Sequence, residues 1–581
     1  MSTLPRHLLH LIAALPVLGG GAACGAGEAA SWDEPAESAL AAAPAAARMP
    51  ATFSLEEYRA TVTDSLVRAG LTAADSGAEL PRVFVNTAMP PVTGRSRRVR
   101  AGDDLQRALD AARPGDELVL EPGATFTGSF VLRRKPGASG GAWITIRTAG
   151  SLPPAGTRVS PANAAQMPKL VAAHPTESAL LTEAGAHHYR LVGLEIAGAP
   201  GQATGYTLVA LGDGGEAQKT LDQVPHHLVL DRVYIHGSPT LGLQRCVGLN
   251  SGTTAIVDSY LTDCHGKGFD SQAIGGWNGP GPYRIVNNYL AGAGENVMFG
   301  GADPHIRGLT PSDIEIRRNH LHKPLEWRGR WTVKNLFELK HAQRVLVEGN
   351  VMENNWVDAQ AGFAVLFTPL SDNNSAPWTT VRDVTFRHNV VRNSPAGVNV
   401  SGGNAYGPNP VWPEPAARID IVNNLLVDIG AEGQNGRLFQ LLNDIRGLRI
   451  AHNTGLATHS AILFESDRGP LKGLVVVDNV LAHGEYGFFS SNGQGTAALD
   501  RFAPGAVVTG NVLIGAPADR YPAGNFFPPA ARELFINRRD GDYRLRSFAA
   551  TGIGARADDG KPRGVDMAAL REATDGVVQK P

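Results

Sequence analysis

The sequence predicts an all-β chain folded as a right-handed parallel β-helix solenoid, with a capping helix at its N-terminal end. From about residue 190, short apolar strands end at an asparagine that an apolar pair follows, as in YRIVNNYL, VLVEGNVM and IDIVNNLL. Eight such units recur at intervals of 26 to 39 residues, which is the length of one coil. The 581-residue chain is also rich in glycine (68) and poor in charged residues (19%). That composition suits many turns and stacked strands better than helices.

The recurring asparagine has a physical role at the bend of each coil. Asparagine tolerates left-handed backbone angles, so we expect it to make the turn between two strands. Stacked coils would bring the amides into register, where they can hydrogen-bond along the stack. A β-propeller or an irregular sandwich, the alternatives, fits poorly with near-regular coils that share one bend residue. The residues are Asn288, Asn319, Asn350, Asn389, Asn424, Asn453, Asn479 and Asn511.

Residues 1–24 are predicted to be an export signal. Arg6 precedes an apolar run that is too short to cross a bilayer, and small residues follow it. The run ends in GAAC, which resembles a bacterial lipobox and predicts lipidation of Cys24; ordinary signal cleavage nearby is the alternative. Residues 25–95 are expected to form an Ala/Pro-rich tether and a helical segment. The mature protein would be exported to the periplasm, the outer membrane or the cell surface, with a possible lipid anchor.

Residues 96–150 contain the predicted capping helix and first coil. The stretch AGDDLQRALDAARPGDELVLEPG reads as an amphipathic helix, a turn and a strand. The helix would cover the open end of the tube, whose free strand edges otherwise invite aggregation. Residues 151–535 are expected to form the β-helix, and residues 536–581 a closing segment. Cys246 and Cys264 could form a disulfide between adjacent coils of an exported protein, or remain two buried thiols.

Polar residues occupy equivalent places on several strands that follow the asparagine bend. With apolar residues inward, Asp270, Glu338 and Lys340 would point outward, and Glu295 begins a strand between them. Coils stack ~4.8 Å apart, so these residues would lie on three successive rungs within ~10 Å. The net charge of −2 provides no basic surface for nucleic acid. The outward polar residues therefore predict a carbohydrate-binding face, with a polysaccharide as partner.

Aromatic and cationic residues in the predicted loops favour the same interpretation. Trp277 lies in one loop, and Trp327 and Trp331 bracket Arg328 and Arg330 in another. Flat aromatic side chains suit the apolar faces of sugar rings, and arginines suit sugar carboxylates. The alternative is that these tryptophans only pack the loops onto the tube.

The start and the closing segment of the chain resemble those of pectate-lyase-like β-helix proteins. The run ELK at residues 338–340 is similar to a strand of the alginate lyase and chondroitinase B group, which carries acidic calcium ligands and then a lysine base. The resemblance implies that Lys340 is the base and that calcium binds Asp270, Glu295 and Glu338. The next strand, GFAVLFTP, lacks the arginine of that group.

Three functions remain open at this point. The first is a polysaccharide lyase for uronic-acid polymers, in which calcium neutralises the uronate and Lys340, its pKa lowered by burial and a neighbouring cation, takes the ring proton. The second is an inverting glycoside hydrolase that uses Asp270 and Glu338 as its carboxyl pair. His265 is a further acid/base candidate, or a structural residue. The third is a non-catalytic adhesive β-helix, in which Glu338 and Lys340 would be an exposed ion pair of little energetic value.

Overall fold

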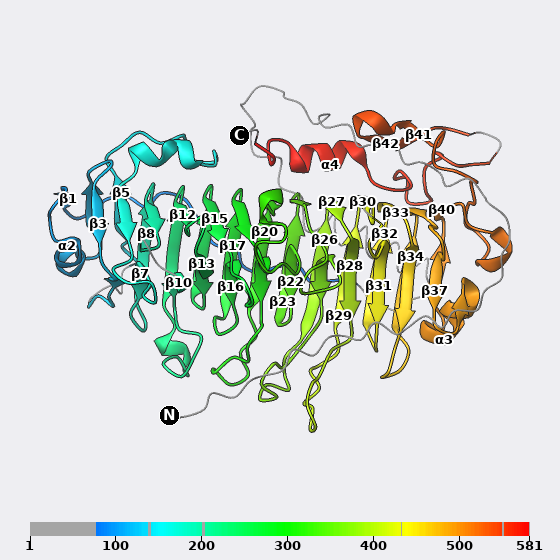
Figure 1. Cartoon of the computed structure of the whole chain (residues 1–581), viewed down its shortest axis with the longest axis horizontal. Helices are drawn as coiled ribbons and strands as arrows, with labels where there is room; N and C mark the ends of the chain where they lie inside the picture. The colour runs from blue at the N-terminus through cyan, green and yellow to red at the C-terminus, as the bar shows by residue number, and fades with distance from the viewer. Residues whose placement is uncertain (1–76, 137–140, 200–203, 432, 549–550, 580–581) are drawn as a thin grey trace.

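The computed structural model describes residues 77–136, 141–199, 204–431, 433–548 and 551–579 of the chain. Within these residues it confirms the predicted right-handed parallel β-helix (Figure 1). The coils contribute strands to three long sheets, which we call sheets A, B and C and which hold 14, 13 and 13 strands. All pairings within the three sheets are parallel except that of the last two strands of sheet C. The chain passes from sheet A to sheet B to sheet C in each coil and then returns to sheet A.

The strands have the following bounds. Sheet A contains β1 (Ser96–Val99), β2 (Glu117–Leu120), β5 (Ile144–Thr148), β8 (His187–Val192), β11 (His226–Asp231), β14 (Gly252–Val257), β17 (Gly281–Val286), β20 (Ser312–Arg317), β23 (Ala342–Glu348), β26 (Val381–Arg387), β29 (Ala417–Val422), β32 (Arg446–Ala451), β35 (Lys472–Val477) and β39 (Val507–Thr509). Sheet B contains β3 (Thr125–Thr127), β6 (Lys169–Val171), β9 (Glu195–Ala197), β12 (Tyr234–His236), β15 (Tyr260–Cys264), β18 (Tyr289–Gly292), β21 (His320–His322), β24 (Val351–Glu353), β27 (Val390–Ser394), β30 (Leu425–Ile429), β33 (Thr454–Ala457), β36 (Val480–Ala482) and β40 (Val512–Ile514). Sheet C contains β4 (Phe130–Leu132), β7 (Leu180–Thr182), β10 (Thr204–Leu211), β13 (Gly242–Leu249), β16 (Gln272–Gly276), β19 (Glu295–Phe299), β22 (Phe337–Leu339), β25 (Phe363–Phe367), β28 (Ala396–Ser401), β31 (Arg437–Leu442), β34 (Ser460–Glu465), β37 (Phe488–Ser490) and β38 (Gly493–Gln494).

The eight predicted asparagines form one continuous ladder at the bend between sheets A and B. In the middle of the ladder, Asn350 Oδ1 accepts hydrogen bonds from the backbone N–H and the side-chain Nδ2 of Asn319, at 2.9 and 3.0 Å. Asn350 Nδ2 donates in turn to Asn389 Oδ1 at 2.9 Å. The ladder continues to Asn525, one residue beyond the predicted set. The predicted line of asparagines is therefore confirmed, and its amides bond along the stack.

The expectation of left-handed backbone at these asparagines is wrong. The residue before each ladder asparagine adopts that conformation instead, for example Arg318 at φ 55° and His388 at φ 52°. The ladder position is selected for its amide group, which can donate to one coil while it accepts from another. The sharp turn is made one residue earlier, by several residue types.

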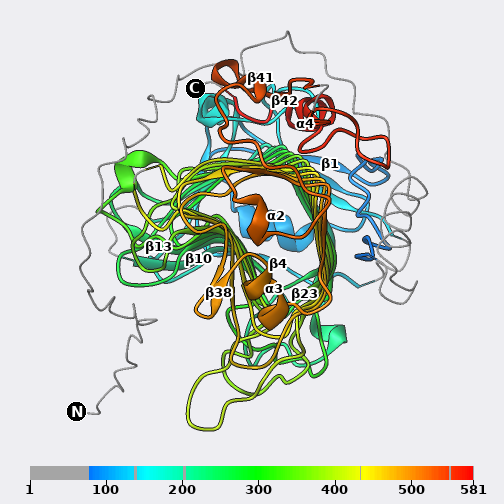
Figure 2. The same ribbon diagram turned by 90° about the vertical axis from the view of Figure 1, so that its right-hand side faces the viewer.

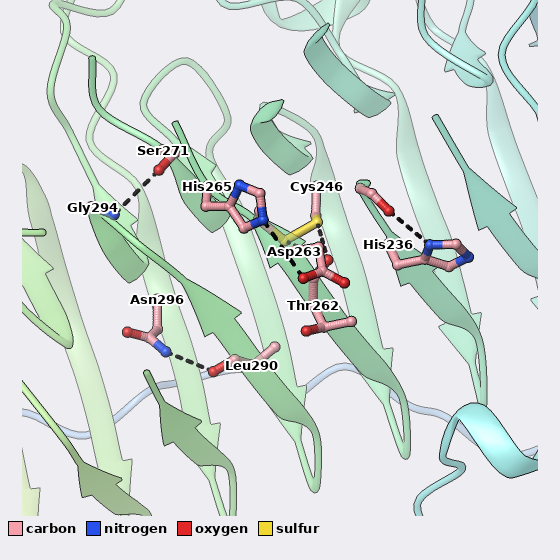
Figure 3. Close-up of a disulfide and its surroundings, with 11 residues drawn as sticks. His236, Cys246, Thr262, Asp263, His265, Ser271, Leu290, Gly294 and Asn296 are labelled. Carbon is pink, nitrogen blue, oxygen red and sulfur yellow. Dashed lines mark hydrogen bonds and ion pairs between the residues drawn. A yellow bond between two sulfur atoms is a disulfide. The ribbon is translucent and has the colours of Figure 1, made fainter. Parts of the chain in front are cut away.

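Apolar side chains fill most of the interior of the tube. Val, Leu, Ile and Phe side chains from all three sheets make one continuous core. In β22, Phe337 and Leu339 are fully buried in this core, so Glu338 between them points outward as predicted. Cys246 and Cys264 also lie in the core and form a disulfide that links adjacent coils, with their Cα atoms 5.5 Å apart (Figure 3). The choice between a disulfide and two thiols is thus decided for the disulfide.

Short helices cover both ends of the tube (Figure 2). Helix α2 (Leu105–Ala111) covers the N-terminal end as predicted, with Leu105 and Leu109 in the core. Helix α3 (Thr496–Phe502) covers the other end and places Leu499 and Phe502 in the same core. This end is therefore closed by α3, which precedes the predicted closing segment in the chain.

Within the predicted closing segment at 536–581, the described residues 536–548 and 551–579 turn back along the outside of sheet B (Figure 1). Strands β41 (Phe535–Asn537) and β42 (Asp542–Leu545) and helix α4 (Met567–Thr574) pack there. Met567 and Leu570 of α4 join outward valines of sheet B in a second apolar cluster. Outward valines on this sheet need such a cover, which explains why the segment lies on the side of the tube rather than across its end.

Residues 77–95, which fall in the predicted tether and helical segment, form an extended strap along sheet A. The backbone N–H of Ala78 donates to Asp420 of β29, and that of Arg82 donates to Asp313 of β20. The strap thus crosses the outer face of sheet A from late coils toward β1. The prediction of a tether or a helix is wrong for these residues, because their polar backbone groups find partners on the sheet.

The predicted signal and lipidation site at Cys24 lie in residues 1–76, outside the described residues. They stay predictions, as does most of the tether. In the part of the chain that the structure describes, no helix is long and apolar enough to span a membrane.

Candidate active site

A cluster of charged side chains lies on the outer face of sheet C and in the loops beside it. We call it the acid–lysine cluster, and it consists of Asp270, Glu295, Lys334, Glu338, Lys340 and Asp372. Two of its carboxylates come from strands, β19 and β22, and the other members from segments next to β16, β22 and β25. Strands hold the first two in fixed positions, and the loops bring opposite charges to them.

The register of the strands places Glu295 and Glu338 in different columns. Glu295 pairs with Gln272 on the rung before, whereas Glu338 pairs with Met298 and Leu366. The two acidic residues therefore differ in their position along the strand, and the longer loop before β22 accounts for this shift. Asn296, the next residue of β19, donates through its Nδ2 to the carbonyls of Leu290 and His322 at 2.6 and 2.9 Å, and Figure 3 shows the first of these bonds.

Oppositely charged groups alternate through the cluster. Lys334 Nζ lies 2.5 Å from Asp270 Oδ2 and 3.8 Å from Glu295 Oε1. Lys340 Nζ lies 3.8 Å from Asp372 Oδ1. Glu295 Oε2 accepts a hydrogen bond from Gln272 at 2.7 Å, and Glu338 Oε2 accepts one from Asn335 at 3.0 Å. Each buried carboxylate is thus held by an amide as well as by a nearby ammonium group.

The cluster has a buried layer and an accessible layer. Glu338 is 2% exposed and Glu295 is fully buried. The side chains of Lys340 and Asp270 are 15% and 39% exposed. Glu338 and Lys340 are therefore not an exposed surface pair, and that alternative is wrong. A ligand that approaches sheet C would meet the two lysines and the two aspartates of the cluster first.

The carboxylates around Lys340 keep it protonated. Burial by itself would lower the pKa of Lys340, but Glu338, Asp372, Glu295 and Asp270 together raise it above its usual range. The expected lowering is wrong, because its neighbours are acids and no cation lies close enough to outweigh them. Lys340 is thus a fixed positive charge, which suits the binding of an anion better than the removal of a proton.

Lys334 is held in the same way. Burial lowers the pKa of Lys334, but the negative charges of Glu295 and Asp270 raise it by more, so the net shift is upward. Two ammonium groups therefore stay charged at neutral pH on one outer face. An anionic ligand can bind them only by competing with their present carboxylate partners.

Glu295 has the opposite character. Burial, together with the negative charges of Asp270 and Glu338, raises the pKa of the Glu295 carboxyl group to about 7, although Lys334 opposes the shift. The group therefore changes its charge near neutral pH. A carboxyl group tuned in this way is a frequent feature of acid/base sites.

This raised pKa predicts a pH dependence of stability. The folded chain binds the Glu295 proton more tightly than the unfolded chain, whose pKa is near 4.5. The resulting stabilisation is complete below about pH 4.5 and is lost as the pH rises through about 7. The melting temperature of Glu295→Gln, which stays neutral, should change less between about pH 5 and about pH 8 than that of the wild type. The exposed control Glu533→Gln should follow the wild type; parallel curves for all three proteins would contradict the raised pKa.

The geometry does not fit the predicted calcium site. Lys334 Nζ lies between Asp270 and Glu295, where a calcium ion would have to bind. Among the described residues, the set of three His, Cys, Asp or Glu side chains whose ligand atoms all lie within 4.8 Å of one another contains only histidines. Asp270, Glu295 and Glu338 do not form such a set, and the ammonium group of Lys334 supplies the positive charge between the first two.

His265 and Trp327 are packing residues. The His265 ring is fully buried and stacks on Trp331 with centroids 3.9 Å apart, and Trp327 meets its edge at 5.0 Å. Trp327 is 3% exposed and packs on Ala291 and Val333. An acid/base role for His265 and a sugar-stacking role for Trp327 both need access from solvent, so these two predictions are wrong. The packing alternative holds for this loop.

Other predicted binding residues remain accessible. Arg328 and Arg330 are exposed and lie over Trp356 and Trp331, at 5.5 and 5.9 Å from the ring centroids. Trp331 is half-buried. These residues belong to the segment that leads into Lys334, so a bound chain could reach them from the acid–lysine cluster. Their role in binding stays a prediction.

Trp277 directly follows strand β16 of sheet C. Its Nε1 donates to the carbonyl of Gly214 at 2.7 Å, and Arg245 lies 4.9 Å from its ring. Arg245 is on the rung next to Gln272. Burial lowers the pKa of Arg245, and the negative charges of Glu295 and Asp270 only partly oppose this shift. This arginine is a third cation beside the cluster.

Sequence reasoning missed Lys334, Asp372 and Arg245. Lys334 stands six residues before Lys340 in KNLFELK, and that local charge pattern could have indicated it. Asp372 lies in the loop after β25, and Arg245 lies on β13, four coils away from it. No local pattern connects these two residues, because loop conformation and coil stacking bring them near the other charges.

No protein-family model matches the sequence, and no curated protein does. Among solved structures, the alginate lyase from Paenibacillus sp. str. FPU-7 is 16% identical over 75% of this chain and 98% of its own, with a TM-score of 0.26. The PL6 family alginate lyase AlyGC is 13% identical over 84% of this chain and 59% of its own, with a TM-score of 0.44. A GH87 alpha-1,3-glucanase from Streptomyces thermodiastaticus strain HF3-3 is 13% identical over 75% and 71%, with a TM-score of 0.41. The chain is structurally similar to β-helix polysaccharide lyases, at low identity only. At these values the likeness carries no weight for function.

Proposed function

We propose that the acid–lysine cluster binds a uronic-acid polysaccharide and that the protein cleaves it as a lyase. The observation that carries the proposal is the pair of accessible lysines, Lys334 and Lys340, which buried carboxylates hold in the charged form. A uronate carboxylate needs cations of this kind. Its neutralisation is also the first requirement of β-elimination, because negative charge develops on that group when the adjacent proton leaves.

The roles within this proposal follow from exposure and charge. Lys340 and Lys334 neutralise the uronate carboxylate. Asp270, the most exposed carboxylate of the cluster, takes the proton from the ring carbon beside that carboxylate. The bond from the next carbon to the glycosidic oxygen then breaks, a carbon–carbon double bond forms, and the departing oxygen takes up the proton that Asp270 removed. Arg328, Arg330 and Trp331 contact neighbouring sugar units.

A specific observation favours a second candidate, the inverting hydrolase. Glu295, with a pKa of about 7, could protonate a glycosidic oxygen while Asp270 acts as the base. Glu295 is fully buried, however. This mechanism therefore requires movement of the segment around Lys334 before a sugar can reach the acid.

The proposal is tested with purified protein and a panel of uronic-acid polymers such as alginate and polygalacturonate. A lyase should produce an unsaturated product that absorbs in the ultraviolet. New reducing ends without that absorbance would favour the hydrolase, and binding without cleavage would favour an adhesive protein. Absence of binding to every polymer would contradict the proposal. A parallel series with added calcium or a chelator should give equal rates if Lys334 provides the charge, and a loss with chelator would restore calcium as the cofactor.

We also propose that the protein is exported and anchored through Cys24. The Cys246–Cys264 disulfide supports an oxidising compartment. Cys24→Ser should move the protein from the membrane fraction to the soluble fraction of exported material. A wild type that is already soluble after export would contradict lipidation.

A further inference from the structure

Four histidines gather on sheet A, in a different sheet from the acid–lysine cluster. They are His187 and His188 at the start of β8, and His226 and His227 at the start of β11. Strands β8 and β11 are neighbours, and their register pairs His187 with His226. Two His-His pairs thus lie on adjacent rungs. We call these four residues the histidine cluster.

The backbone turns both rings of each pair to the same side. Neighbouring side chains on a strand normally point to opposite faces. His188 and His227 have left-handed backbone, with φ of 59° and 54°, which breaks that alternation. The Nδ1 atoms of His187 and His188 consequently lie 2.8 Å apart, and those of His226 and His227 lie 2.6 Å apart.

The left-handed residue recurs at this place in later coils, but with other chemistry. Asp313 and Arg344 occupy it on β20 and β23 and form a salt bridge of 2.8 Å. Asp383 and Arg418 do the same on β26 and β29, at 2.6 Å. The backbone shape is therefore a property of the coil, whereas the imidazoles are specific to β8 and β11.

The rings form a compact block of nitrogen donors. His187 stacks on His226 and His188 on His227, with centroids 4.9 and 4.4 Å apart. One ligand atom from each of His188, His226 and His227 lies within 4.8 Å of the other two. Trp143 closes one side, with its ring edge-on to His188 at 5.2 Å.

The imidazoles are neutral at pH 7 and keep a lone pair. Burial and the neighbouring rings lower the pKa of His188 and of His226 to about 4. Burial also lowers the pKa of His187 and of His227. The charged group that faces His187 and His226 is Arg134, an exposed arginine on the opposite segment.

We propose that the histidine cluster binds a late first-row divalent transition metal ion of the zinc or copper kind. Imidazole nitrogens suit these ions, whereas calcium and magnesium require oxygen ligands. Zinc–nitrogen bonds of about 2.0–2.1 Å place two tetrahedral ligands roughly 3.3 Å apart. The 2.6 and 2.8 Å pairs would have to open by about 0.7 and about 0.5 Å to reach that separation, which small side-chain rotations supply. The ion would link two coils next to Trp143.

The test uses protein purified without a polyhistidine tag and stripped with a chelator. Equilibrium dialysis and calorimetry with Zn²⁺ should give one ion per chain, and Zn²⁺ should raise the melting temperature. Ca²⁺ and Mg²⁺ should do neither. Bound Cu²⁺ should show nitrogen splitting in its electron paramagnetic resonance spectrum. Absence of a stoichiometric Zn²⁺ or Cu²⁺ ion in the wild type would overturn the proposal and leave the rings as a stacking ladder.

The variant His188→Asn/His227→Asn keeps residues that tolerate left-handed backbone. Its Zn²⁺ affinity should fall at least 100-fold, whereas the exposed control His305→Asn should bind like the wild type. Equal binding by the double variant would overturn the assignment. If the double variant does not fold, Cu²⁺ quenching of tryptophan fluorescence decides the matter in folded protein. The quenching should be largely lost in Trp143→Phe, and unchanged quenching in that variant would place the ion elsewhere.

Discussion

Asn350→Ala is expected to destabilise the β-helix by about 4 kcal/mol, since each buried polar group left without a partner costs about 1–3 kcal/mol. Asn350 Oδ1 accepts two hydrogen bonds from Asn319, and its Nδ2 donates to Asn389 and to the carbonyl of Ile316. Alanine removes all four bonds, and Asn350 is fully buried. Unfolding in denaturant, followed by circular dichroism, measures the loss.

Asn409→Ala is the matched control, because Asn409 is exposed in a loop. It should change stability by less than about 0.5 kcal/mol, as surface substitutions usually do. If Asn350→Ala unfolds together with this control, the ladder is a by-product of stacking and contributes nothing measurable to stability.

Lys340→Met is expected to reduce turnover of a uronic-acid polymer by about 10²–10⁴-fold, the range for loss of a group that stabilises developing charge or transfers a proton. It should also destabilise the fold, because Glu338 and Asp372 lose the ammonium group between them. Breaking a buried ion pair costs about 3–5 kcal/mol, far more than the loss of an exposed pair. Melting temperature and initial rates under saturating substrate separate the two effects.

Lys340→Arg distinguishes a cation from a base. Arginine keeps the positive charge but does not lose its proton near neutral pH. If Lys340 acts as a fixed charge, Lys340→Arg should melt close to the wild type and keep turnover within about tenfold of it. The exposed control Lys472→Met should behave as the wild type. A Lys340→Arg protein that folds and binds but is as inactive as Lys340→Met would assign Lys340 as the base.

Much of the fold could be predicted from the sequence because a solenoid is built from local repeats. The period of the asparagines fixed the coil length, and alternation in FEL placed Phe337 and Leu339 inside and Glu338 outside. The inference about Asn350 and its equivalents identified the right residues for a partly wrong reason. Their amides were decisive, and the left-handed turn belongs to the residue before.

The segments at both ends of the chain were harder to predict. The strap at residues 77–95 has no repeat, and its hydrogen bonds go to Asp313 and Asp420 in distant coils. The closing segment has the same character, since α4 lies on valines of coils far from it in sequence. No local sequence pattern predicts which face of the tube such a segment will cover.

The sequence by itself determined that Glu338 and Lys340 share an outward face, and that acidic residues recur on nearby coils. Only the tertiary structure decided the burial, the neighbours and the pKa values of these residues. The loop before β22 shifts Glu338 out of the column of Glu295 and brings Lys334 between Asp270 and Glu295. The pKa of a buried group depends on the sum of all charges around it, and most of those charges come from other coils. Alternation along a strand is a local property that a sequence displays directly, whereas burial and electrostatic environment exist only when the coils and loops are stacked.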